Sequence, residues 1–349
     1  MASHVIDMIM LQNNFGTPEM RDIWNDTNRL QKHLDVEAAL ALAEGELGII
    51  PSEDAQKIVA HAKVELFNIE QIAQDVARVK HSLTPTINAL QALAGENVHF
   101  GPTTQDIVDT GTILQLKEAH HIILRELKEI VKELAHLVKE HRTTLIVGRS
   151  HGMQALPTTF GFKLAVILSE VVRHIQRLSE VESRVFTGVL AGAVGTYASF
   201  GEKGIEIEAL ALEKLGLNTP EICWHSSRDR ISEYASILGL ISGTLGKVGN
   251  EFYNLMRTEV NELEEPFSAG KIGSSTMPHK RNPAALEGLA SLTRPIFHSV
   301  ALIHESLIVE HERDAMSWRA EWIALPEICI YLSAQLSIAK NIFKGLIVK

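Results

Sequence analysis

Eleven consecutive residues, from Gly273 to Pro283, carry the side chains best suited to chemistry in this sequence. A glycine followed by two serines gives a backbone that bends freely, so hydroxyls and free N–H groups can turn toward an anion. Lys280 adds a positive charge, Asn282 adds an amide that donates and accepts hydrogen bonds, and Pro283 suits the first turn of a helix. The stretch predicts a small anion-binding loop with a candidate nucleophile or base. Its composition alone fits a turn between two helices equally well.

The full run, GSSTMPHKRNP, resembles the signature loop of the fumarase/aspartase superfamily (GSS-x-MP-x-K-x-NP), and every fixed position of that pattern is present. The resemblance implies an anti β-elimination, in which a proton next to a carboxylate is removed and a group on the neighbouring carbon is expelled. It assigns the base to Ser274 as an alkoxide, and the binding of a substrate carboxylate to Lys280 and Asn282. Serine is a poor base unless its surroundings stabilise the alkoxide, so Lys280 and the loop N–H groups are expected to do so.

A second stretch, from Gly148 to Thr159, supplies a candidate acid. The residues alone favour a simple turn for His151, because a glycine follows it. The segment resembles, however, the G-R-[ST]-H segment of the same superfamily, whose histidine is the general acid of the elimination. The same resemblance places Glu287 as the carboxylate that orients His151.

The stretch from Val98 to Asp106 contains two adjacent hydroxyl side chains, Thr103 and Thr104, just before a long helical pattern. Threonine there can cap a helix, and the free N–H groups of a helix start attract anions. The stretch resembles the first signature region of the superfamily, whose hydroxyls hold a substrate carboxylate. Capping and carboxylate binding are compatible, so we expect both, although serine is commoner than threonine at the second position.

Two histidines, His81 and His99, are candidate substrate-positioning groups. The adenylosuccinate lyase branch of the superfamily also has a basic residue followed by histidine, as in Lys80-His81-Ser82. Taken singly, each histidine is more often a surface or core residue than part of a site. The resemblance nevertheless makes both of them candidates for contact with the substrate.

The stretch from His311 to Trp322 bears most on the choice of substrate. Adenylosuccinate lyases grip the nucleotide phosphate with an arginine, a serine five residues later and a second arginine nine residues later. Arg313 is present, but Trp318 and Trp322 occupy the other two positions, and apolar rings cannot replace a hydroxyl and a guanidinium on a phosphate. We therefore expect adenylosuccinate to be a poor substrate and a smaller di- or tricarboxylate to be preferred, unless both tryptophans belong to the core.

These stretches predict a lyase that cleaves a C–N or C–O bond in a succinyl-type substrate and releases fumarate, including a substrate whose leaving group is not a nucleotide. An alternative is a lactonising 3-carboxy-cis,cis-muconate cycloisomerase, which the run from Trp224 to Arg230 and both late tryptophans resemble. Against it, bacterial cycloisomerases carry their catalytic histidine three residues further along, at Gln154. A catalytically silent structural homologue is a second alternative, which the complete set of candidate residues argues against. No His, Cys and Asp set has metal-ligand spacing, so we expect neither a metal nor another cofactor.

Long helices must position these residues. Apolar side chains recur at spacings of three and four from Ile113 to Leu137, the seam pattern of a bundle helix, here expected over 105–140. Other helices are expected over 30–47, 158–182, 228–262, 283–310 with a break near Pro295, and 320–346, where Pro326 is tolerated only near the start or at a kink. The sequence therefore predicts an all-α protein, with an N-terminal helical domain over 1–101 and a central long-helix bundle domain over 102–349.

The resemblance covers essentially the whole chain and implies the fumarase/aspartase-like fold, a homotetramer whose long central helices form a common core. Seams of this length also need long neighbours to cover them, which favours a bundle shared between subunits. In the superfamily a smaller third helical domain usually follows the bundle. This chain ends at Lys349, about where that domain would begin, so we expect the third domain to be truncated or missing here.

Composition limits the partners and the compartment. A chain with 45% hydrophobic but only 5% aromatic residues suits packed helices, and a formal charge of −10 disfavours nucleic acid, which would need a basic face. Residues 1–12 lack the basic region of a signal peptide, and the most apolar stretches are too short to cross a bilayer. We expect a cytoplasmic enzyme with a small-molecule carboxylate substrate and no nucleic-acid or membrane partner.

Overall fold

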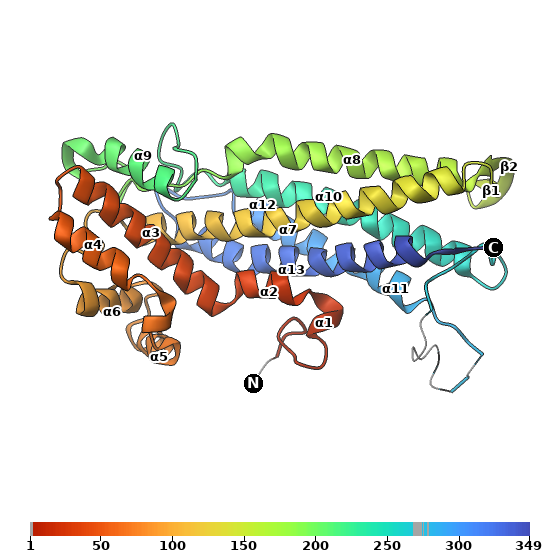
Figure 1. Ribbon diagram of the computed structural model, residues 1–349, viewed down its shortest axis with the longest axis horizontal. Helices are drawn as coiled ribbons and strands as arrows, with labels where there is room; N and C mark the ends of the chain where they lie inside the picture. The colour runs from red at the N-terminus through yellow and green to blue at the C-terminus, as the bar shows by residue number, and fades with distance from the viewer. Residues whose placement is uncertain (1–2, 268–273, 275, 278) are drawn as a thin grey trace.

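The computed structural model describes residues 3–267, 274, 276–277 and 279–349, which form an elongated, mostly helical bundle (Figure 1). The elements are, in chain order, α1 (Gln12–Phe15), α2 (Pro18–Trp24), α3 (Asp26–Glu46), α4 (Ser52–His61), η1 (Val64–Leu66), α5 (Ile69–Val79), α6 (Thr84–Ala94), α7 (Thr104–Glu140), β1 (Leu145–Ser150), β2 (Met153–Thr159), α8 (Phe160–Val185), η2 (Gly201–Lys203), α9 (Gly204–Lys214), α10 (Asp229–Met256), β3 (Leu263–Glu264), α11 (Ala284–Ser291), α12 (Thr293–Glu305), α13 (Ala315–Gly345) and β4 (Ile347–Val348).

Four long helices, α7, α8, α10 and α13, run along the long axis of the molecule (Figure 1). α7 is the central one and packs against α3, α8 and α13. The seam expected from Ile113 to Leu137 is buried along its whole length, as predicted. At 1.5 Å per residue, the 37 residues of α7 span about 55 Å, so its two ends lie at opposite ends of the bundle.

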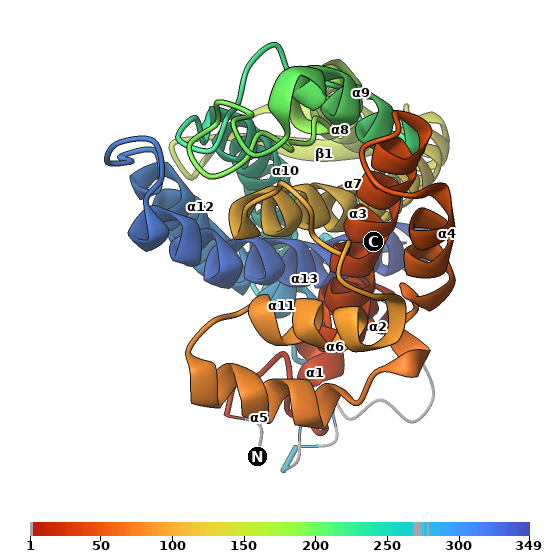
Figure 2. The same cartoon turned by 90° about the vertical axis from the view of Figure 1, so that its left-hand side faces the viewer.

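The helices α3 to α6 cover the end of the bundle at which α7 begins, whereas α1 and α2 lie nearer its middle (Figure 1). α3 packs along α7 and α4, and α6 packs against both α4 and α5 (Figure 2). α3 begins at Asp26, earlier than expected, because the Asn25 side chain accepts a hydrogen bond from the N–H of Asn28 at 2.8 Å and caps it.

α13 also begins earlier than expected. The Asp314 carboxylate accepts a hydrogen bond from the N–H of Met316 at 2.7 Å and caps the helix at Ala315. Pro326 therefore lies in the interior of the helix, where it has no N–H to donate, so of the two expected positions the one near the start is excluded and the one at a kink stays a prediction. The break near Pro295 is confirmed, because α11 ends at Ser291 and α12 begins at Thr293.

A β-hairpin follows α7 that the sequence analysis did not anticipate. β1 and β2 pair antiparallel, with Ser150 opposite Met153. The two residues between them, His151 and Gly152, both have positive φ (53° and 77°). Positive φ at both loop residues is the pattern of a type I′ turn, which matches the twist of paired strands. The turn expected for His151 is thus the tip of a hairpin.

α13 is long and apolar enough to cross a membrane when judged by length and composition alone. In the structure 67% of its most apolar window is buried against the other helices. α13 is therefore the kind of helix found in the core of a bundle.

Candidate active site

The predicted site residues fall into three groups that one chain does not bring together. His81, Thr103, Thr104 and Arg313 lie at the end of the bundle where α7 and α13 begin. His151 lies in the hairpin at the other end of α7 (Figure 1). The remaining ones, Ser274, Lys280, Asn282 and Glu287, lie before and in the first turn of α11.

Three members of the first group, His81, Thr104 and Arg313, line a cavity of about 620 Å³. The walls come from the end of α5, the residues that follow it, the start of α7 and the start of α13. The polar and aromatic side chains in the wall are Lys80, His81, Ser82, Thr104, Gln105, Arg313, Trp318, Arg319 and Trp322. None of the twelve described residues that line this space is acidic. We call it the cationic cavity.

Contacts at the two ring nitrogens of His81 show which one accepts a hydrogen bond and which one can donate. Its Nδ1 accepts a hydrogen bond from the N–H of Thr84 at 3.0 Å, at the start of α6. A nitrogen that accepts carries no proton, so in the neutral ring the proton lies on Nε2. Nε2 is 3.4 Å from the hydroxyl oxygen of Thr104 and is the nitrogen available to donate in the cavity.

The start of α7 is held by Asp106. The Asp106 carboxylate accepts the N–H of Thr103 at 2.8 Å and the N–H groups of Ala191 and Gly192 at 3.0 and 2.9 Å. It also lies 2.8 Å from Nε2 of His225, and both side chains are buried. These contacts fix the two threonine hydroxyls, and Arg313 donates to that of Thr103. The expectation that a threonine caps this helix is confirmed for Thr103, which is the N-cap residue of α7.

The two tryptophans line the cavity wall instead of lying wholly in the core. Their rings meet edge to face with centroids 4.9 Å apart, and both side chains are half-buried. The indole N–H of Trp318 donates to Asp109 at 3.0 Å. The guanidinium of Arg29 lies over the ring of Trp322 at 4.8 Å. The side of α13 that carries both rings therefore faces the cavity, as the sequence analysis expected.

A buried ion cluster holds this wall in place. Arg228 donates to both oxygens of Asp109 at 2.6 and 3.0 Å, and its Nε donates to Glu321 at 2.8 Å. All three side chains are only 2% exposed. Removing one member of such a cluster costs about 3–5 kcal/mol, because it leaves a buried charge without its partner. The sequence analysis missed this cluster, whose members come from α7, α13 and the residue before α10.

The loop that precedes α11 gives Ser274 donors suited to a negatively charged oxygen. The Ser274 hydroxyl accepts hydrogen bonds from the N–H of Met277 at 3.1 Å and of Thr276 at 3.4 Å. Such donors favour the alkoxide over the neutral hydroxyl. Lys280 is exposed and Asn282 is half-buried nearby in the chain. Gly273, Ser275 and Pro278 of the same motif lie outside the described residues.

His151 and Glu287 do not meet within one chain. Both side chains are exposed, and the described part of the chain offers His151 no hydrogen-bond partner. The hairpin that carries His151 is anchored by Arg149, which donates to both oxygens of Glu262 at 2.9 and 2.6 Å. The backbone at His151 is left-handed, a conformation that costs energy for any residue except glycine and is common at functional sites.

His99 has a structural partner and does not line the cationic cavity. Its Nδ1 lies 2.6 Å from the carboxylate of Glu37, which is 1% exposed. Burial disfavours the imidazolium, but the charge of Glu37 outweighs this effect and raises the pKa of His99. The structure therefore places His99 in a buried ion pair and not among the cavity-lining groups with which the sequence analysis grouped it.

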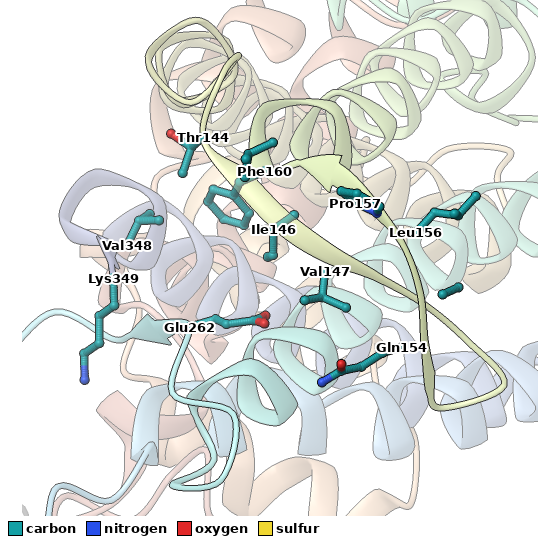
Figure 3. A pocket seen from close by; sticks show the side chains of 12 residues that line it. Thr144, Ile146, Val147, Gln154, Leu156, Pro157, Phe160, Glu262, Val348 and Lys349 are labelled. Atoms are coloured by element: carbon teal, nitrogen blue, oxygen red, sulfur yellow. The ribbon is translucent and has the colours of Figure 1, made fainter.

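A second cavity, of about 400 Å³, lies at the far end of the bundle between the hairpin and the paired strands β3 and β4 (Figure 3). Apolar side chains such as Ile146, Phe160 and Val348 make up most of its wall, with Gln154 and Glu262 as polar groups. None of the predicted catalytic or binding residues lines it. The cationic cavity is the candidate substrate pocket because His81, Thr104 and Arg313 line it.

Comparison with known proteins identifies the family. The sequence pattern of the Lyase family matches residues 13–297. N-acetyl-S-(2-succino)cysteine lyase of Dickeya dadantii is 66% identical over 349 residues, covering 99% of this chain and 77% of that protein. Adenylosuccinate lyase of Pyrococcus abyssi is 42% identical over 352 residues, covering 99% and 77%.

A solved structure shows the same fold at high similarity. The crystal structure of 3-carboxy-cis,cis-muconate lactonizing enzyme from Pseudomonas putida aligns with a TM-score of 0.92 and 38% identity, covering 96% of this chain and 77% of that one. The predicted mostly helical superfamily fold is thereby confirmed. Because the family pattern spans most of the chain and the relatives share both sequence and fold with it, the chain belongs to the Lyase family and is a lyase of the fumarase/aspartase superfamily.

Proposed function

We propose that this lyase cleaves a thioether of succinate, N-acetyl-S-(2-succino)cysteine or a close analogue, to give fumarate and a free thiol. The observation that carries the proposal is the pair of tryptophans in the wall of the cationic cavity. Their apolar rings occupy the positions at which adenylosuccinate lyases have a serine and an arginine that bind phosphate. The 66% identity to a lyase named for this thioether supports the same choice. The leaving atom would then be sulfur, beyond the C–N and C–O bonds expected from the sequence.

The proposed reaction is a β-elimination. Ser274 as an alkoxide takes a proton from the CH₂ carbon of the succinyl group, and the electron pair forms an aci-carboxylate on the adjoining carboxylate. Collapse of this species makes the C=C bond of fumarate and breaks the C–S bond on the neighbouring carbon. The sulfur leaves with the bonding pair and receives a proton from His151. Lys280 and Asn282 bind the carboxylate on which charge builds up.

Sulfur is an easier leaving atom than nitrogen or oxygen, because a thiol has a pKa of about 8.5 and its anion is stable in water. Because this pKa lies above 7, the thiolate still takes up a proton as it leaves, and His151 supplies it. The active enzyme is proposed to be a soluble cytoplasmic protein without a cofactor.

The separation of the three groups supports a site built from several copies of the chain in a homotetramer. About 55 Å of helix lies between the cationic cavity and the hairpin, so His151 can reach a substrate there only from another copy. Large apolar side chains are exposed along the bundle, among them Phe162 of α8, Leu240 of α10 and Phe297 of α12. Exposed apolar surface of this kind is typical of faces that pack against another protein.

The test is a comparison of substrates in steady state. We expect kcat/KM of about 10⁴ M⁻¹s⁻¹ or more on N-acetyl-S-(2-succino)cysteine, followed by fumarate absorbance and by titration of the released thiol. Adenylosuccinate should be slower by about a hundredfold or more, because its phosphate would meet the two indole rings without hydrogen-bond partners.

One variant serves as the control for this assay, and two outcomes would contradict the proposal. Ser274→Ala should lower turnover on the thioether by about a thousandfold while the thermal melting curve stays unchanged. Efficient fumarate release from adenylosuccinate would contradict the proposal. Loss of the diene absorbance of 3-carboxy-cis,cis-muconate would instead favour the cycloisomerase, the activity of the structurally similar lactonizing enzyme.

A further inference from the structure

Two basic side chains in the cationic cavity, Lys80 and Arg319, were given no role by the sequence motifs. Lys80 ends α5 in a left-handed conformation, with φ of 56°, and Arg319 lies on the first turns of α13. Both line the cavity and both are exposed. In the described part of the chain neither side chain has a hydrogen bond or ion pair. Arg313, by contrast, donates to the hydroxyl of Thr103.

The cavity therefore contains positive charge that the protein itself does not neutralise. The neighbouring carboxylates, Asp109 and Glu321, are buried behind the wall and are engaged by Arg228. Clefts lined by one sign of charge attract ligands of the opposite sign. An anionic group of the ligand is the missing partner of Lys80 and Arg319.

The chemistry of the proposed substrate supplies such a group. N-acetyl-S-(2-succino)cysteine has three carboxylates, two on the succinyl half and one on the cysteine half. The succinyl carboxylates have candidate partners in the signature loop and at the start of α7. Acetylation removes the positive charge of the cysteine nitrogen, so the leaving group as a whole is an anion.

We propose that Arg319 and Lys80 determine substrate specificity by binding the carboxylate of the thiol leaving group. This inference rests on the proposed function. Arg319 follows Trp318 directly and is three residues from Trp322, so the charged group adjoins the apolar wall that the acetyl methyl would contact. The segment is held rigidly, because the next turn carries Glu321, which Arg228 binds at 2.8 Å.

A matched pair of substrates tests the inference. N-acetyl-S-(2-succino)cysteine and N-acetyl-S-(2-succino)cysteamine differ only by the carboxylate of the leaving group. A charge-assisted hydrogen bond is worth about 1.5–3 kcal/mol, so the enzyme should prefer the first substrate by about 10- to 100-fold in kcat/KM. The preference should reside mostly in KM, because this carboxylate lies away from the reacting carbons.

Variants then show which side chains bind the carboxylate of the leaving group. Arg319→Gln and Lys80→Gln should each lower kcat/KM on the cysteine substrate by about tenfold and change it less than about twofold on the cysteamine substrate. Arg319→Lys should keep part of the preference, since it keeps the charge. Arg78→Gln is the matched control, because Arg78 lies two residues before Lys80 on α5 but pairs with Asp75 and does not line the cavity.

The outcomes separate the two proposals. Equal kcat/KM on both substrates in the unmodified enzyme, or equal losses on both substrates in the variants, would overturn the specificity role and leave the lyase activity standing. No fumarate from either substrate would overturn the proposed function and this inference with it. Melting curves of Arg319→Gln and Lys80→Gln should match the unmodified enzyme, since both side chains are exposed.

Discussion

At the scale of single residues, His81 combines a structural contact with a binding contact. Its Nδ1 accepts the N–H of Thr84 at the start of α6, while its Nε2 faces the hydroxyl of Thr104 and the cavity. A change to alanine would remove both contacts and so could not tell them apart. Amides of different length can replace the two nitrogens one at a time, because the asparagine oxygen lies near the position of Nδ1 and the glutamine amide near that of Nε2.

We expect His81→Asn to keep the thermal melting temperature and to lower kcat/KM by about tenfold or more, since the donor at Nε2 is lost. His81→Gln should retain more activity but lose about 1 kcal/mol of stability, because the start of α6 loses its acceptor. Kinetics and chemical unfolding of the two variants give the answer. Full activity in His81→Asn would show that His81 is a helix cap only.

The motif residues could be named from the sequence because their side chains are neighbours in the chain, as in the short loop around Ser274. The same reasoning missed Lys80 and Arg319 as a pair. They are far apart in sequence, and only the packing of α5 beside the start of α13 places them around one cavity. The contact of His99 with the buried carboxylate of Glu37 could not be predicted either, because Glu37 comes from α3.

At the scale of elements, the start of α7 depends on the contact between Asp106 and His225. Burial disfavours the charged form of His225, but the hydrogen bond with Asp106 and the adjacent Cys223 outweigh it and raise the pKa of His225 to about 10. The value in the unfolded chain is near 6.5. The folded protein therefore binds an extra proton between these pH values, and the stability from this pair is complete below pH 6.5 and lost as the pH rises through 10.

We expect His225→Gln to lower the free energy of unfolding by a few kcal/mol, roughly 2–5, at pH 6. The gap to the unmodified protein should close as the pH approaches 10, because the unmodified protein then loses the imidazolium that the variant lacks. Urea unfolding from pH 6 to 10 measures the gap. His136→Gln is the control, since His136 is exposed on α7 beside Glu140. A gap that stays constant over this range would contradict the assignment of charge to His225.

Long elements were easier to predict than short ones. The burial seam of α7 repeats over many turns, and each repeat adds to the signal. The helix starts at Asp26 and Ala315 depend on one capping side chain each, which propensity alone places poorly. The hairpin turn has only two residues, His151 and Gly152. A histidine followed by glycine tolerates positive φ, but these two residues are the only indication of the turn in the sequence.

At the scale of the whole molecule, one chain holds all the chemical groups of the proposed reaction but keeps them apart. The length of α7 separates the cationic cavity from the hairpin, and no local rearrangement can bridge about 55 Å. The sequence analysis expected a bundle shared between subunits, from the superfamily resemblance and from the length of the helix seams. The fold now gives a physical reason for it, because the bundle is rigid and its exposed apolar side chains lie along the same long helices.

A site shared between copies makes a prediction for mixtures of inactive variants. Ser274→Ala removes the proposed base and His151→Asn the proposed acid, so each variant alone should be slow on the thioether. If Ser274 and His151 of one site come from different chains, a mixed oligomer can contain sites with both side chains intact. Random assembly from equal amounts would give about a quarter of sites with both groups, because each is intact with a chance of about one half.

We therefore expect that unfolding and refolding the two variants together restores up to about a quarter of the unmodified kcat, whereas each variant refolded alone stays inactive. Light scattering should show the same tetramer in all samples. Mixing without unfolding serves as the control, because subunits that do not exchange cannot form new sites. If the co-refolded sample stays as slow as its parents while remaining tetrameric, Ser274 and His151 act from the same chain. The cationic cavity would then receive both groups from one neighbouring copy, because the length of α7 keeps the hairpin about 55 Å from the cavity of its own chain.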